Sequence, residues 1–391
     1  MHNGKLRTIF TVVLAIVTVI CVAFAVVVFM GEETTDKTVG VVSENDETTE
    51  SVVSDTSNVN SKEETSAENS KPQIDENIDL PIYYEISNDV IKVVSKYNKN
   101  EDRCTELRKK GGNNLFDFYT AYIIKNSGNS VSTHTKGTEV YRNTTDFHAP
   151  FIIRALNNID GDNPKSWEFT GGNHAYNGNN TGSATARTTS LEFWVDNRKI
   201  SNGSGKFSGK AKVIEIRWSN NVQANNTVKK DGSGREVLTE KHTLTFNGEE
   251  WTSHIELIPL EDIQCYTWYG LQCSLNSEIL PNNQNGEMYA GVYKFINGKN
   301  NAEIDLTASE IPVTSSGNSK ATGMIAQKGN NAVSMVIDPN YHLGKRNMYS
   351  GDKGVFFNVK TKKTYFNIIE NQILKANTSY FLRGTYKFYS V

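Results

Sequence analysis

The sequence predicts an all-β fold, a large antiparallel β-sandwich of supersandwich or jelly-roll type, preceded by a membrane segment and a tether. Alternating apolar and polar residues recur in short runs from residue 82 to the C-terminus, a pattern typical of strands with one buried face. Turns rich in Asn and Gly separate these runs, and no amphipathic helix pattern of useful length occurs among them. Many strands with almost no helix favour a sandwich.

The N-terminus predicts a signal anchor in the cell membrane. Residues 1–7 form a short basic stub, and Thr8–Met30 is an uncharged apolar run that is long enough to cross a bilayer as a helix. Lys5 and Arg7 precede the run, so we expect a cytoplasmic stub and an extracellular remainder. A cleaved signal peptide is the alternative, because Ala23-Phe24-Ala25 resembles a cleavage site. Five further apolar residues follow that site and favour the anchor.

Residues 31–79 predict a disordered, acidic, Ser/Thr-rich tether. The segment holds 14 acidic residues, three lysines and no aromatic residue, and such a chain cannot bury enough surface to offset its ordering entropy. Of the formal net charge of −3, the tether accounts for −11 and the first seven residues for +2, which leaves +6 for residues 80–391. This mildly basic extracellular domain favours an anionic partner such as an acidic glycan or cell-wall polymer. The charge is too small to indicate nucleic acid, and no nucleic-acid motif is present.

The domain begins with a predicted hairpin, in which Ile82–Ile86 and Val90–Tyr97 are joined at Ser87-Asn88-Asp89. Helical features occur only in Asn100–Lys110, so we expect at most one short helix, near Glu101–Lys109. Asn247-Gly248 is the strongest hairpin signal in the chain. Further strands are expected at Leu115–Ile124, Ser190–Val195, Lys212–Trp218, Glu236–Phe246, Trp251–Leu260, Met288–Phe295, Val333–Ile337, Gly354–Val359, Thr364–Ile369 and Tyr380–Tyr389.

The segment Trp167–Thr189, here called the glycine loop, is the first candidate site. Gly171-Gly172 permits positive φ and close backbone approach, and Asn173, His174 and Tyr176 follow directly. With Arg187 downstream, these residue types suit a glycan: an amide or cation can neutralise a uronate carboxylate, and His or Tyr can act as a base. The same side chains suit binding without catalysis. A purely structural connection between two strands, with Asn173 and His174 satisfying backbone groups, is also open.

Two other segments supply candidates for the same site. Tyr266-Thr267-Trp268-Tyr269 places aromatic rings where sugar faces could stack, although one of Trp268 and Tyr269 is expected to fill the core. The loop from Asp338 to Arg346 contains His342 with two neighbouring cations, and it suits either a basic cleft or a solvated turn. We expect Asn173, His174, Tyr176, Arg187, Trp268, Tyr269 and His342 to meet at one concave face.

Metal and disulfide chemistry are weakly indicated. Asn158, Asp160 and Asp162 alternate around a glycine turn like the start of a calcium loop, but a closing bidentate Glu is missing. An Asp-Gly turn with Asx hydrogen bonds is the alternative. We therefore predict no cofactor, with calcium as the one candidate. Cys265 and Cys273 flank an interval that a hairpin could close as a disulfide.

The run Lys241–Leu257, two long strands joined by a tight turn, resembles the supersandwich of galactose-mutarotase-like and polysaccharide-lyase domains. The resemblance covers little of the chain and brings no catalytic motif of those families. It implies a sugar-related β-sandwich, and fold likeness alone does not define an activity.

These observations predict a membrane-anchored extracellular protein whose sandwich binds an anionic glycan or wall polymer. The alternative is a carbohydrate-active enzyme of lyase or epimerase type acting on an acidic polysaccharide, with Asn173, His174, Tyr176 and Arg187 as its catalytic residues. A structural envelope protein is the third possibility. Abundant Asn, Lys and Ile with a short basic anchor resemble Gram-positive surface proteins.

Overall fold

A computed structural model describes residues 80–142, 146–178, 181–275, 288–298, 303–308, 320–341, 346–349, 354–358 and 361–391. All of them belong to one compact unit, residues 74–391. The predicted stub, anchor at Thr8–Met30 and tether at residues 31–79 lie outside the described residues, and so does His342. Among the residues that are described, no helix is long and apolar enough to span a bilayer.

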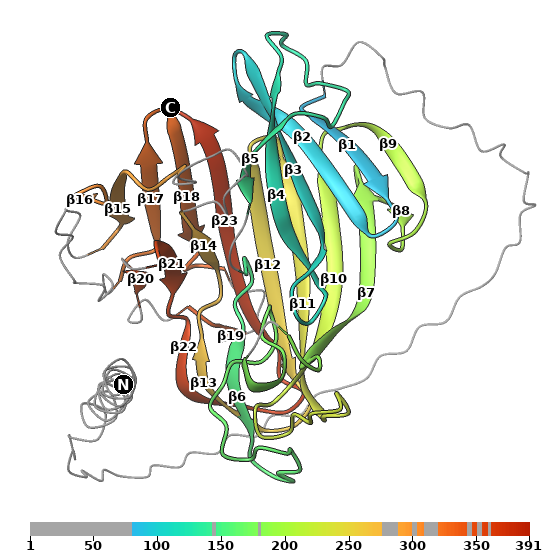
Figure 1. Cartoon of the computed structure of the whole chain (residues 1–391), viewed down its shortest axis with the longest axis vertical. Coiled ribbons are helices and arrows are strands. Elements are labelled where there is room, and N and C mark those ends of the chain that lie inside the picture. The colour runs from blue at the N-terminus through green and yellow to red at the C-terminus, as the bar shows by residue number, and fades with distance from the viewer. Residues whose placement is uncertain are drawn as a thin grey trace, which may run out of the picture. The chain divides into compact units, whose positions relative to one another are not determined.

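One face of the sandwich is a six-stranded antiparallel sheet with the order β5-β4-β3-β2-β1-β9 (Figure 1). The predicted first hairpin is confirmed, because β1 and β2 pair from Ile82↔Ser95 to Ser87↔Val90. The strands of this sheet are β1 (Ile82–Ser87), β2 (Val90–Asn98), β3 (Glu101–Lys110), β4 (Leu115–Lys125), β5 (Thr138–Arg142) and β9 (Lys206–Ala211).

The opposite face is a larger sheet that contains eleven strands within the described parts of the chain. Its main path is β16-β15-β17-β18-β23-β12-β11-β10-β7-β8, and β19 pairs in parallel with β23. The strands are β7 (Ala186–Val195), β8 (Arg198–Ser201), β10 (Ile214–Gln223), β11 (Glu236–Asn247), β12 (Glu250–Pro259), β15 (Val292–Ile296), β16 (Ile304–Asp305), β17 (Gly323–Lys328), β18 (Asn331–Ile337), β19 (Arg346–Asn347) and β23 (Tyr380–Ser390).

Two three-stranded sheets complete the domain. One has the order β22-β13-β6, and the other has the order β14-β21-β20. These strands are β6 (Phe151–Ala155), β13 (Ile263–Trp268), β14 (Gln272–Ser274), β20 (Val355–Asn358), β21 (Lys363–Phe366) and β22 (Ile369–Leu374).

The core lies between the two large sheets and is rich in aromatic rings. Phe116 of β4 packs edge-on against Trp218 of β10 at 5.3 Å, and Phe118 lies 5.1 Å from Trp251 of β12. All four rings are at most 4 % exposed, and burying each one contributes roughly 1.5–3 kcal/mol. These contacts join the six-stranded and eleven-stranded sheets face to face, and the predicted all-β antiparallel sandwich is confirmed.

The one short helix that the sequence allowed near Glu101–Lys109 is not formed. The segment is strand β3, which pairs with β2 on one side and with β4 on the other. Its charged residues hid the strand pattern because several of them are buried with partners. Arg103, only 4 % exposed, lies over the Phe388 ring at 3.9 Å, and buried Asp102 pairs with Lys96 at 2.9 Å. Tertiary contacts override local propensity here.

The strongest hairpin signal is confirmed, whereas the possible disulfide is not formed. Strands β11 and β12 pair closely up to Asn247↔Glu250, and Gly248 in the turn has a φ of 68°. Cys265 and Cys273 are both free and fully buried. They lie in different small sheets, on β13 and β14, rather than on the two arms of one hairpin.

Candidate functional site

The largest group of predicted site residues meets at an open pocket of about 430 Å³ beside the glycine loop. The loop supplies one wall, β20 and β21 supply another, and the connection from β13 to β14 lies between them. The pocket combines aromatic rings with charged and amide side chains: Asp146, Pro150, Phe169, Asn173, His174, Tyr269, Gln272, Phe356, Asn358, Lys363 and Tyr365. A concave site with apolar walls and a few convergent polar groups is typical of ligand-binding pockets.

The glycine loop turns sharply at Gly171 and Gly172, where φ is 73° and 50°. Gly171 and His174 form an isolated antiparallel bridge, so Gly172 and Asn173 make the tip of the turn. Both glycines are needed for this close backbone path. A side-chain methyl on Gly172 would lie 2.9 Å from the carboxyl carbon of Asp146, which is closer than real contacts allow.

Buried polar groups hold the loop in place from below. The amide of Asn113 donates to the carbonyl oxygens of Gly172 and His174, at 2.9 and 3.0 Å. The hydroxyl of Thr185 donates to the His174 carbonyl and accepts a hydrogen bond from the Gly171 backbone amide. Both Asn113 and Thr185 are almost fully buried. The backbone that presents Asn173 and His174 is therefore preorganised by a satisfied network.

Asp146 is the buried acid of this pocket. Burial raises the pKa of its carboxyl from the ordinary 3.8 to about 7, and nearby Asp117 adds to the shift while Lys110 opposes it. A carboxyl with such a pKa exchanges its proton close to neutral pH. A hydrogen bond from the Asn173 backbone and the charge of Lys363 partly stabilise the ionised form.

His174 faces Asp146 across the loop. Its Nδ1 lies 3.2 Å from the carbonyl oxygen of Gly178, and its Nε2 lies 4.0 Å from Oδ2 of Asp146. Burial lowers the pKa of His174 below the ordinary 6.5, so the ring is neutral at pH 7. Because a carbonyl oxygen can only accept, the neutral ring carries its proton on Nδ1. The lone pair on Nε2 is then on the side of the ring that faces Asp146.

Four aromatic residues wall the pocket. Tyr269 lies 5.4 Å from Phe356, 5.0 Å from Tyr365 and 6.0 Å from Phe169, measured between ring centres. Phe356 and Tyr365 are stacked at 4.9 Å. Rings of this kind offer flat apolar faces that can cover the C–H face of a sugar.

Lys363 supplies the positive charge. Its ammonium group lies close enough to Asp146 and His174 to lower the pKa of each. Asn358 on β20 and Gln272 on β14 add amide groups around the same opening. A cation with several amides can hold a carboxylate together with hydroxyl groups.

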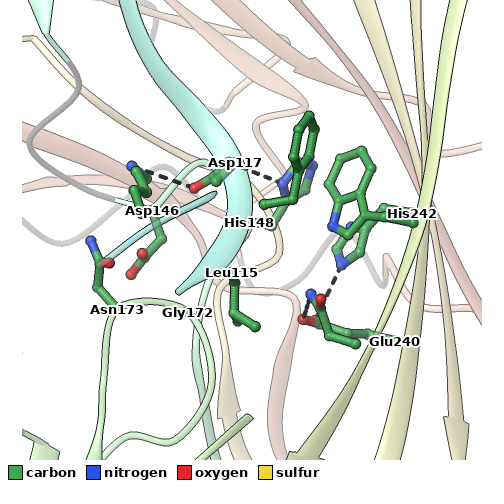
Figure 2. Close-up of a pocket in the computed structure, with 12 residues that line it drawn as sticks. Leu115, Asp117, Asp146, His148, Gly172, Asn173, Glu240 and His242 are labelled. Atoms are coloured by element: carbon green, nitrogen blue, oxygen red, sulfur yellow. Dashed lines mark hydrogen bonds and ion pairs between the residues drawn. The ribbon is translucent and has the colours of Figure 1, made fainter. Parts of the chain in front are cut away.

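Asp146 and Asn173 also line a much smaller cavity of about 20 Å³, which Figure 2 shows. His148 and His242 lie in it with ring centres 4.5 Å apart, and Oε2 of Glu240 lies 3.4 Å from Nε2 of His242. This volume suits about one water molecule. It is too small for a sugar, so the cavity belongs to the support of Asp146 and not to a ligand site.

Ser253, His148 and Asp117 lie in contact in that order within the same buried region, as in a catalytic triad. Nε2 of His148 lies 2.9 Å from the Ser253 hydroxyl, and its Nδ1 lies 3.4 Å from Oδ1 of Asp117. Ser253 is 1 % exposed and lines neither space. A nucleophile must reach the reacting carbon. Because Ser253 is buried and faces neither space, these three residues have a structural role.

The sequence-predicted site residues are only partly brought together. Asn173, His174 and Tyr269 line the pocket, whereas His342 lies outside the described residues. Trp268 was expected at the ligand face, but it is a core residue, 1 % exposed and stacked on Phe151 at 5.6 Å.

The other two predicted residues lie away from the pocket. Arg187 is exposed at the start of β7, where its guanidinium pairs with Glu236 of β11. Tyr176 begins a single 3-10 turn, Tyr176–Gly178, and is half-buried without lining the pocket. Neither residue lines the pocket that Asn173, His174 and Tyr269 line.

The calcium candidate has protein partners for its carboxylates. Oδ1 of Asp160 lies 3.5 Å from Nε of Arg235, and Asp162 accepts a hydrogen bond from the Lys230 backbone. The Asn158 carbonyl accepts from the same Arg235 guanidinium at 2.6 Å. Among the residues described, no group of three or more His, Cys, Asp or Glu side chains is placed to hold a metal ion.

Five pocket residues were not predicted from the sequence as site residues: Asp146, Lys363, Phe169, Phe356 and Tyr365. Asp146 lies in a short connection without a recognisable motif, and Lys363 and Tyr365 belong to an ordinary short strand. Phe169 had a signal, because it lies two residues before the glycine pair. The others come together only through the pairing of β20, β21 and β14.

No family model matches the sequence, and no curated protein is significantly similar to it. The structure has weak likeness to the galactosidase domain of alpha-galactosidase-sucrose kinase, with 6 % identity over 77 % of this chain and a TM-score of 0.34. A GH36 alpha-galactosidase from Geobacillus stearothermophilus in complex with stachyose gives 8 % identity over 79 % of this chain, with a TM-score of 0.34. The chain spans about two fifths of the length of each, 40 % in both cases. The sequence resembles sugar-related β-sandwich domains only weakly, and the structure resembles them only weakly too. This likeness carries no information on activity.

Proposed function

We propose that the β-sandwich binds an anionic glycan or wall polymer in the 430 Å³ pocket. The observation that carries the proposal is the combination of Tyr269, Phe356 and Tyr365 rings with the Lys363 cation and the Asp146–His174 pair in one opening. The rings suit sugar faces, Lys363 suits a uronate carboxylate, and the polar pair suits hydroxyl groups.

Binding to immobilised polygalacturonate, with neutral dextran as the reference polymer, tests this proposal. Tyr269→Ala and His174→Ala should each weaken retention on polygalacturonate at least tenfold, since each removes a pocket contact. His134→Ala is the matched control, because His134 is exposed on the loop between β4 and β5. Equal retention on both polymers, or unchanged retention by the two pocket variants, would contradict the proposal.

A lyase or epimerase acting on an acidic polysaccharide is the second candidate. The specific observation that favours it is the neutral Nε2 of His174 facing a carboxyl with a pKa near 7, at 4.0 Å. His174 could take the C5 proton of a uronate whose carboxylate Lys363 neutralises, and Asp146 could return a proton. In the lyase, the C4–O bond would break, the C4=C5 double bond would form and the Asp146 proton would pass to the leaving oxygen; in the epimerase, a proton delivered to the opposite face of C5 would give the epimer.

The two functions are separated by incubation with polygalacturonate in deuterium oxide. Ultraviolet absorbance from an unsaturated uronate, or deuterium at C5, would establish catalysis. Retention of the polymer with neither signal establishes a binding protein.

We further propose that the domain is displayed outside the cell membrane, on an anchor at Thr8–Met30 and a tether at residues 31–79. The support is sequence alone: the uncharged apolar run, the basic residues before it and the acidic segment after it. Protease added to intact cells should release a soluble fragment close in mass to residues 80–391. Protection of that fragment would show the opposite orientation.

A further inference from the structure

An aromatic pair outside the pocket repeats the chemistry found inside it. The rings of Trp167 and Tyr266 meet edge-to-face at 4.5 Å, and the Arg154 guanidinium lies 5.0 Å from the Trp167 ring. Trp167 is 54 % exposed, second only to the terminal Val391 among the exposed large apolar side chains of the described residues. Two adjacent rings with a cation beside them offer the same kinds of contact as the pocket walls.

The pair is held in place by its own contacts. Arg154 of β6 donates to the carbonyl oxygens of Ser166 and Pro164, at 2.7 and 2.6 Å. These hydrogen bonds fix the backbone immediately before Trp167. Within the described residues Arg154 pairs with backbone carbonyls and with no carboxylate, so the positive charge over the Trp167 ring is not neutralised by an acidic side chain.

The pair is continuous with the pocket through two chain segments. Trp167 lies two residues before Phe169, and Tyr266 lies three residues before Tyr269. Phe169 and Tyr269 line the pocket and contact each other at 6.0 Å. Two extended residues span about 7 Å, so the outer pair follows the inner pair at roughly one sugar ring's distance.

On the glycine-loop side, side-chain direction agrees with this continuity. In an extended segment, residues two apart share one face, which places Trp167 and Phe169 on the same side. Glu168 points the other way, toward Gly178, where its carboxylate lies within 2.7 Å of the position of a glycine Cβ. The acidic residue between the two rings is therefore turned away from the aromatic track.

We propose that Trp167, Tyr266 and Arg154 form an outer subsite for further units of the same anionic glycan chain that occupies the pocket. This inference rests on the proposed function and deepens it: the ligand is a polymer several sugars long. Ring faces and one cation recur at both places, Lys363 inside and Arg154 outside, as a repeating uronate requires.

The test is a length series of oligogalacturonates, from the dimer to the octamer, titrated against the full-length protein. Trp167→Ala should weaken octamer affinity about tenfold, the size of one lost stacking contact, and leave dimer affinity unchanged. Trp167→Phe should restore most of the octamer affinity. Trp194→Ala is the matched control, since Trp194 also lies under an arginine, Arg217 at 4.1 Å, but on strand β7 beside Glu192.

The outcomes separate this inference from the proposed function. Unchanged octamer affinity in Trp167→Ala, or an equal loss for dimer and octamer, would overturn the outer subsite even if Tyr269→Ala still abolishes dimer binding. Unchanged dimer affinity in Tyr269→Ala would instead overturn the pocket as the primary site. A loss in Trp194→Ala equal to that in Trp167→Ala would show a general effect of removing a surface tryptophan, and would also overturn the outer subsite.

Discussion

The backbone of Gly172 lies directly against the carboxyl group of Asp146. A methyl group at Gly172 would be 2.9 Å from both the carboxyl carbon and Oδ2, and 3.3 Å from Oδ1. The glycine therefore does two things at once: it adopts a φ of 50° and it leaves space for the buried acid. This contact connects the shape of the glycine loop to the protonation of the pocket.

Gly172→Ala should destabilise the fold and also weaken glycan binding. The left-handed backbone alone costs about 1–2 kcal/mol for a residue with a Cβ, and displacement of the Asp146 carboxyl adds to it. Gly329→Ala is the control, because Gly329 has a φ of 57° and open space around it. Urea unfolding and affinity for polygalacturonate measure the two effects. If Gly172→Ala and Gly329→Ala lose the same stability and neither loses affinity, the contact between Gly172 and Asp146 has no role in folding or binding.

Asp146 should make the protein less stable as pH rises from about 4 to about 7. The folded carboxyl has a pKa near 7 while the unfolded one stays near 3.8, so the folded state binds more protons in this window and its stability falls with pH. A shift of this size corresponds to roughly 4 kcal/mol. Asp146→Asn removes the titration, so the variant should gain stability relative to the wild type between pH 5 and pH 8.

Urea unfolding of both proteins at several pH values measures this difference. Asp117→Asn provides the contrast, since Lys110 and His148 hold the pKa of Asp117 below its ordinary value despite its burial. Asp117→Asn should therefore not gain stability relative to the wild type as pH rises. A wild-type minus Asp146→Asn difference that is flat from pH 5 to pH 8 would rule out the raised pKa.

Thr185→Val should destabilise the glycine loop, whereas Thr185→Ser should be tolerated. Valine keeps the shape but removes the hydroxyl that bonds the His174 carbonyl and the Gly171 amide. Two buried backbone groups then lose a partner, at a cost of about 1–3 kcal/mol. Serine retains both hydrogen bonds. Thermal unfolding ranks the variants, and hydrogen exchange at the Gly171 amide locates the change. Similar exchange rates in the two variants would contradict the assigned role of the hydroxyl.

The strands of the sandwich were largely predictable because their alternation reflects one buried and one open face. In Ile82–Ser87, buried residues alternate with half-buried ones, and the sequence shows the matching apolar–polar alternation of a strand. Strand β3 was not, since Asp102, Arg103 and Glu106 are buried charged residues whose partners lie in other strands. A sequence shows that a residue is charged, but not that a distant ring or cation compensates it.

The candidate site also contains residues that the sequence predicts and residues that it does not. The glycine loop with Asn173 and His174 was recognisable, because paired glycines before an amide and an imidazole form a local pattern. Asp146 and Lys363 are more than 200 residues apart in sequence and meet only through the topology of the small sheets. Trp268 and Tyr269 illustrate the remaining ambiguity: adjacent residues in a strand face opposite sides, and composition does not say which side holds the core.

The free cysteines give the last prediction. Cys265 and Cys273 are buried without a disulfide, and burial raises the pKa of the Cys273 thiol to about 12. Cys104 is also free and buried, and its thiol pKa is raised to about 12 for the same reason. Since the thiolate is the reactive form, these thiols should resist alkylation in the native protein and react after unfolding in urea. A reductant should leave the thermal midpoint unchanged. A lower midpoint with reductant, together with a peptide linking Cys265 to Cys273 in the non-reduced digest, would show that the hairpin interval is closed by a disulfide after all.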